Sequence, residues 1–127
     1  KVQAKMKNPS FVMSGGYSPY EIMGMISIMD FVISMRLHTL IFAARRRIPL
    51  IGLVYDPKIE YYLEKLKMPS GGGVTEFKLK KAMDMVDDMV LNKDKYVSVL
   101  EAEEEKLERK AHENEEHLIR LLEQERC

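Results

Sequence analysis

Two short, continuously apolar segments constrain the fold of this chain more than any other feature. Residues 31–34 and 48–54 have the length of strands and contain few polar side chains. Such runs are typical of strands buried on both faces of a parallel sheet, so we expect 31–34 in the middle of one. The stretch between them, residues 37–46, is apolar until its end and predicts a crossover helix. The sequence therefore predicts an α/β fold with right-handed parallel crossovers, as in half of a doubly wound sheet.

Further elements are predicted on either side of this unit. Ser18, Pro19 and Glu21 have the spacing of a capping box, which predicts a helix over residues 19–29. The run Gly71–Gly73 lacks a following Lys-Ser/Thr, so it is not a nucleotide P-loop, and we expect a flexible loop or turn. The other expected elements are the end of a helix over 1–7, a strand over 11–14, and helices over 59–67 and 77–91.

The length of 127 residues suits one small domain, and the C-terminal part has a different character. We expect residues 1–94 to form the α/β unit and residues 95–127 to form one long charged helix. Its heptad-like seam holds Leu100, Leu107, Ala111, Leu118 and Leu121, interrupted by Glu104 and Asn114. The interruption disfavours a robust coiled coil, so we expect the helix to dock against a second lobe or a partner chain.

Charge is distributed unevenly although the formal net charge is zero. Residues 1–67 carry ten Lys/Arg against five Asp/Glu, and residues 101–127 carry five against ten. A basic first half suits an anionic substrate or lipid surface, whereas the pattern of clustered cations and aromatics expected for nucleic acid is missing. The triplet Arg45–Arg47 predicts a solvated helix end or a contact with anionic head groups. The one cysteine, Cys127, excludes a disulfide within the chain and fits a cytoplasmic location.

Candidate site residues follow both predicted strands directly. Arg36 and His38 come after the first strand, and Tyr55 and Lys58 come after the second. Because the carboxyl ends of parallel strands meet at one crevice, we expect these side chains to converge on an anionic ligand. Arg36 and Lys58 can bind phosphate or carboxylate, and His38 can act as a general acid near neutral pH.

The histidines also have interpretations that involve no function. A lone histidine in an apolar helix, such as His38, is often a core residue whose nitrogens are satisfied by the backbone. His112 and His117 are five residues apart, which does not place them on one helix face, so we expect no metal site.

The residues around this site resemble a known family. Residues 35–44 read M-R-L-H-T-L-I-F-A-A and residues 48–59 read I-P-L-I-G-L-V-Y-D-P-K-I, with G-Y-S-P-Y-E at 16–21 and M-D-F-V-I at 29–33. This pattern resembles the polysaccharide pyruvyl transferases, most closely the bacterial CsaB type, over about residues 11–100. The likeness falls on the C-terminal lobe of a glycosyltransferase-B-like fold, which implies an N-terminal lobe or partner chain that completes the active site.

The resemblance also implies a reaction. Phosphoenolpyruvate is the expected donor, no cofactor is expected, and the acceptor is a sugar or a lipid-linked saccharide of cell-wall polysaccharide synthesis. His38 is then the catalytic acid, while Arg36, Lys58 and Tyr55 bind substrate in the cytoplasm or at the inner face of the membrane. The alternatives are a nucleotide-sugar glycosyltransferase lobe and a non-catalytic binding or assembly domain of the same fold.

Overall fold

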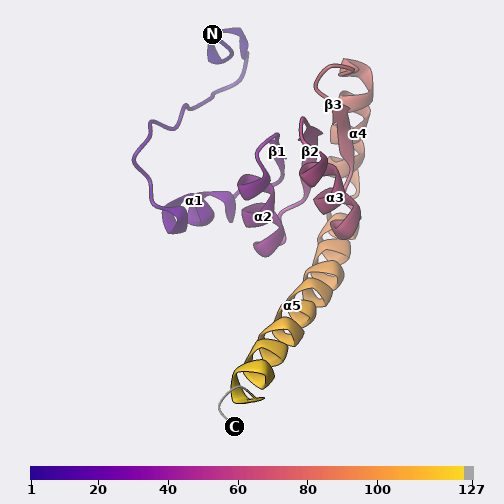
Figure 1. Ribbon diagram of the computed structural model, residues 1–127. Coiled ribbons are helices and arrows are strands. Elements are labelled where there is room, and N and C mark those ends of the chain that lie inside the picture. Colours follow the sequence, from indigo (N-terminus) through magenta and orange to yellow (C-terminus); the bar gives the residue numbers. More distant parts are fainter. Residues whose placement is uncertain (125–127) are drawn as a thin grey trace.

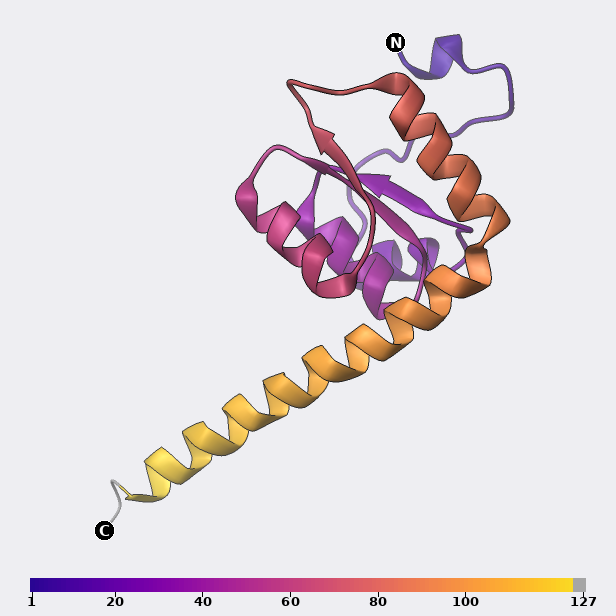
Figure 2. The same ribbon diagram turned by 90° about the vertical axis from the view of Figure 1, so that its right-hand side faces the viewer.

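The computed structural model describes residues 1–124 and has a three-stranded parallel sheet between layers of helices, followed by one long helix (Figure 1). The elements are a 3-10 helix (Gln3–Lys5), α1 (Pro19–Ile26), β1 (Val32–Ser34), α2 (Leu37–Arg45), β2 (Leu50–Val54), α3 (Pro57–Leu66), β3 (Ser70–Gly73), α4 (Leu79–Leu91) and α5 (Lys93–Gln124). Helices α2 and α3 cover one face of the sheet and α4 lies over the other (Figure 2). This arrangement confirms the predicted α/β class, a Rossmann-like half-domain with a long C-terminal helix. Cys127 lies outside the described residues.

The order of strands differs from the prediction. The sheet runs β1-β2-β3, with Val32 opposite Leu50 and Ser34 opposite Gly52, so β2 is the central strand and β1 is an edge. The expectation that residues 31–34 lie in the middle of the sheet is therefore wrong. The reason is that residues 11–14 form no strand beside β1: Phe11 is 94% exposed, and the N-terminal segment leads away from the sheet (Figure 1).

The third strand is the glycine run that we expected to be a loop. Gly71 lies so close to β2 that a Cβ atom there would come within 2.7 Å of the Leu53 Cδ2 atom. Gly72 adopts a positive φ of 86°, which side chains disfavour. The run therefore forms β3 because glycine permits a close and irregular approach to β2, where the register shifts.

Ends of the helices follow local signals closely. Ser18 caps α1 through a complete capping box with Glu21, as predicted, and Pro19 is the first helical residue. The helix ends at Ile26 instead of Met29. At the other end of the first crossover, Arg47 has a positive φ of 58°, which terminates α2 and redirects the chain into the next strand.

The main core lies between the sheet and helices α1, α2, α3 and α5. Its most buried side chains include Leu40, Leu50, Ile59, Leu63, Leu66 and Leu100. β2 and α3 approach each other closely at Gly52, where a Cβ atom would come within 2.5 Å of the Leu63 Cδ1 atom.

This contact leads to a prediction for stability. Gly52→Ala should lower the free energy of unfolding by about 1–3 kcal/mol, because Leu63 is fully buried and must shift to admit the methyl group. Urea denaturation followed by circular dichroism measures the change. Gly24→Ala is the control, since Gly24 has open space around its Cβ position and lies in a helix, where alanine is favoured. Equal stability of Gly52→Ala and the unmodified chain would contradict the close packing.

Helix α5 docks on this chain's own body with its first half. Leu100 is fully buried in the main core, and Leu107 packs against it. The second half projects away from the body (Figures 1 and 2), and Leu118 there is 57% exposed. The predicted seam is thus covered near its start and open near its end. Neither α5 nor any other helix within residues 1–124 is long and apolar enough to cross a membrane.

Ion pairs hold the docked half of α5 against the end of α2. Arg45 lies 3.4 Å from Glu104 and 3.8 Å from Glu108, and Arg47 lies 3.3 Å from Glu101. The side chains of Arg45 and Arg47 stay 52% and 57% exposed, so the triplet is a solvated helix end, as predicted, and two of its members also pair with α5. Part of the acidic surface of α5 thus pairs with the basic end of α2.

Candidate functional site

The turn after β1 places two cationic side chains at the start of α2. The backbone N–H of Arg36 donates a hydrogen bond to the Ser34 hydroxyl at 2.9 Å, which fixes the turn. Arg36 is the N-cap residue, and its side chain makes no capping hydrogen bond. His38 lies in the first turn of α2, and both side chains are exposed. The first amides of α2 therefore have no side-chain cap, unlike those of α1 and α3.

The turn after β2 places the third cation. Asp56 caps α3, as predicted, by accepting a hydrogen bond from the Lys58 backbone N–H at 2.8 Å. Pro57 occupies the first helical position, where its missing N–H costs nothing. Lys58 is exposed in the first turn of α3, and Tyr55 is exposed just before the cap. The Asp56 cap thus orients the turn that carries Lys58.

These two turns enclose one cavity of about 320 Å³. It is lined by Arg36, Leu37, His38, Thr39, Tyr55, Asp56, Lys58 and Ile59. All four residues that the sequence singled out as a site therefore face the same space, which lies at the carboxyl ends of β1 and β2. Two permanent cations and one histidine share this cavity with a single carboxylate, and α2 and α3 both begin there with the positive ends of their dipoles. Such an arrangement is suited to an anionic ligand.

The exposure of His38 and Arg36 shows whether these side chains belong to the core or are accessible to a ligand. The buried residues of α2 are Leu40, Ala43 and Ala44, so His38 is not a core histidine. Arg36 is also exposed, so solvent can stabilise its charge where no ligand is bound. Within residues 1–124, neither Arg36 nor Lys58 is ion-paired with a carboxylate. Their positive charges are thus available to a ligand.

Sequence reasoning missed an apolar cavity of about 410 Å³ next to this site. It is lined by Leu37, Ile41, Pro57, Lys58, Tyr61 and Tyr62. Leu37 and Lys58 line both cavities, so the cationic and apolar spaces are contiguous. The signal was present in the sequence as Leu37 and Ile41, four residues apart on one face of α2, opposite the tyrosine pair of α3.

Tyr62, at the edge of this apolar cavity, has a structural role. Burial raises the pKa of its hydroxyl well above the ordinary value, and the charge of Glu104 raises it further. The hydroxyl therefore stays protonated at neutral pH, close to Glu104 on α5. Tyr62 links α3 to α5 and is unsuited to proton transfer.

A comparison with protein-family models found a match. The model of the family polysaccharide pyruvyl transferase matches residues 2–57, a segment that includes Arg36, His38 and Tyr55 and ends one residue before Lys58. The searches of curated proteins and of solved structures found no match. The match agrees with the resemblance seen in the sequence: residues 2–57 are similar to the polysaccharide pyruvyl transferase family, whose name describes transferases.

Proposed function

We propose that this chain forms the donor-binding lobe of a pyruvyl transferase that uses phosphoenolpyruvate. In this proposal Arg36 and Lys58 bind the phosphate and carboxylate of the donor, and Tyr55 forms the wall of the cavity. A sugar or lipid-linked saccharide, as for the CsaB type, is the acceptor, and an N-terminal lobe or partner chain completes the site. The observation that carries the proposal is the single cavity lined by residues from two separate strand ends.

The proposed chemistry gives His38 and Lys58 each a step. His38 donates a proton to the methylene carbon of the donor, which leaves positive charge at C2. A hydroxyl of the acceptor then bonds to C2, the C2–O bond to phosphate breaks, and the phosphate leaves with the bonding electrons. A second acceptor hydroxyl bonds to C2 and closes the ketal. Of the two hydroxyl protons, one goes to the phosphate and the other returns to His38, while Lys58 stabilises the departing charge.

Donor binding is the first test of this assignment. Arg36→Ala and Lys58→Ala should each weaken phosphoenolpyruvate binding by roughly 1.5–3 kcal/mol, because each removes a charge-assisted contact. Isothermal titration of the 127-residue chain measures the effect. Arg46→Ala is the matched control, since it removes the same charge from the opposite end of α2.

The same titration separates the alternatives. Tighter binding of a nucleotide sugar than of phosphoenolpyruvate would favour a glycosyltransferase lobe and contradict the proposal. Binding of neither ligand would favour a non-catalytic binding or assembly domain. An equal loss of donor affinity in Arg46→Ala would show that overall charge, and not the cavity, attracts the donor.

A further inference from the structure

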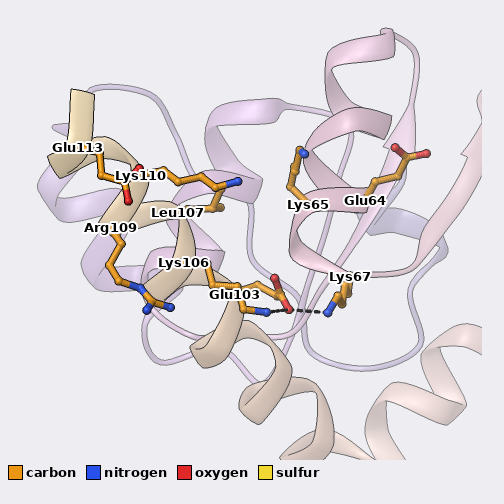
Figure 3. Close-up of a pocket in the computed structure, with 9 residues that line it drawn as sticks. All are labelled: Glu64, Lys65, Lys67, Glu103, Lys106, Leu107, Arg109, Lys110 and Glu113. Atoms are coloured by element: carbon orange, nitrogen blue, oxygen red, sulfur yellow. Dashed lines mark hydrogen bonds and ion pairs between the residues drawn. The ribbon is translucent and has the colours of Figure 1, made fainter. Parts of the chain in front are cut away.

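A second basic cavity lies between α3 and α5, away from the strand-end site (Figure 3). Its volume is about 430 Å³, larger than that of the strand-end cavity. The lining residues are Glu64, Lys65, Lys67, Glu103, Lys106, Leu107, Arg109, Lys110 and Glu113. Five cations face three carboxylates there, so the lining carries a net positive charge. We propose that this cavity binds the phosphate group of a small soluble ligand.

A buried carboxylate holds two of these cations in place. Oε1 of Glu103 accepts from Lys67 Nζ at 2.7 Å and from Lys106 Nζ at 2.8 Å (Figure 3). Hydrogen bonds from Lys106 and Lys67 hold the pKa of Glu103 below its ordinary value, so the carboxylate stays ionised at neutral pH. Because both ammonium groups contact one oxygen atom, they lie close to each other without a ligand present.

The two ammonium groups form part of an anion-binding site in this proposal. Each ammonium has three N–H donors and uses one of them on Glu103. The side chains of Lys67 and Lys106 are 64% and 49% exposed, so their other donors reach the solvent-filled cavity. A tetrahedral phosphate offers several acceptor oxygens at short spacing and can bridge both groups. Arg109 and Lys110 come from the next turn of α5 and add further positive charge.

The cavity is separate from the donor site. Lys58 lies in the first turn of α3, whereas Lys67 follows its last residue, so the two positions are separated by roughly 13 Å along the helix axis. One phosphate cannot contact both positions. A ligand between α3 and α5 would instead bridge the body and the docked half of α5.

A soluble ligand fits better than an anionic membrane. Beyond this cavity α5 continues for a further eleven residues, 114–124, which carry three glutamates against one arginine. These carboxylates project from the body and would be repelled by an anionic lipid surface. A small phosphate compound avoids this repulsion because it enters the cavity alone.

The test uses inorganic pyrophosphate as the probe and the chain with Arg36→Ala and Lys58→Ala as the background, which removes the strand-end cations. Isothermal titration should still detect saturable binding. Adding Lys106→Gln should weaken it about tenfold, as expected for loss of one charged hydrogen bond. Arg109→Gln should weaken it several-fold without disturbing the Glu103 pairs. Arg46→Gln, with the same change of net charge outside the cavity, should leave affinity within twofold.

Any one of three results would overturn the proposal. Absence of saturable binding to the background chain would show that the cavity holds no phosphate. Equal losses in Arg46→Gln and Lys106→Gln would assign the binding to general electrostatics. Flotation with phosphatidylglycerol vesicles, but not with phosphatidylcholine vesicles, that is lost in Lys106→Gln would assign the cavity to lipid head groups. Circular dichroism at 222 nm establishes that each variant is folded before titration.

Discussion

His38→Ala should lower turnover by about two to four orders of magnitude in a two-lobed protein that contains this chain. The reason is that His38 is the proposed proton donor and lines the donor cavity without contributing to the core. Donor affinity should stay within a few-fold, because in the proposed mechanism Arg36 and Lys58 supply the main contacts with the donor. Steady-state kinetics with phosphoenolpyruvate, together with a binding titration of the same variant, measures both quantities.

The variant His38→Gln distinguishes proton donation by His38 from hydrogen bonding by His38. Glutamine can donate a hydrogen bond but cannot give up a proton at neutral pH, so this variant should be nearly as slow as His38→Ala. Near-normal turnover in His38→Gln would reject the acid role and leave His38 as a positioning residue. A loss of donor affinity as large as the loss of turnover would point to the same conclusion.

Leu100→Ala should cause the largest loss of stability, about 2–5 kcal/mol in the free energy of unfolding. Leu100 is fully buried where α5 crosses the main core, so truncation leaves a cavity between α5 and the body. Urea denaturation followed by circular dichroism measures the loss. Leu118→Ala is the matched control on the projecting half of α5, where the side chain is exposed, and its effect should stay within about 0.5 kcal/mol.

Similar effects of the two leucine substitutions would contradict the docking of α5. If both were small, the first half of α5 would not pack on the body. If both were large, the projecting half would have a partner, as expected from the sequence for a helix that docks against a second lobe or another chain.

The central crossover was predictable because its signals are local. Two apolar strands flank an apolar helix, and Ser18 and Asp56 sit at positions where their side chains cap helices. The strand ends then determine where Arg36 and Lys58 lie, since parallel strands end at one edge of the sheet. This is why the four candidate site residues could be grouped before the structure placed them around one cavity.

The wrong predictions concern which segments pair as β-strands, and the local sequence does not encode this pairing. Residues 11–14 are apolar enough for a strand, but a strand forms only where a neighbour accepts its backbone hydrogen bonds. The glycines 71–73 show no side-chain pattern at all, and they form β3 because β2 offers an open edge. The two missed cavities depend on packing between helices, namely α2 against α3 and α3 against α5, and a spacing such as that of Leu37 and Ile41 indicates only one wall of such a cavity.

The central claim, that the strand-end cavity binds phosphoenolpyruvate, is tested most directly by nuclear magnetic resonance of the ¹⁵N-labelled chain. The amide signals of the two turns, residues 34–39 and 55–59, should shift in a saturable way as phosphoenolpyruvate is added. The same signals should shift much less in Arg36→Ala at equal donor concentration, whereas Arg46→Ala should behave as the unmodified chain. Saturable shifts that fall elsewhere, or shifts of the two turns with a nucleotide sugar but not with phosphoenolpyruvate, would contradict the account.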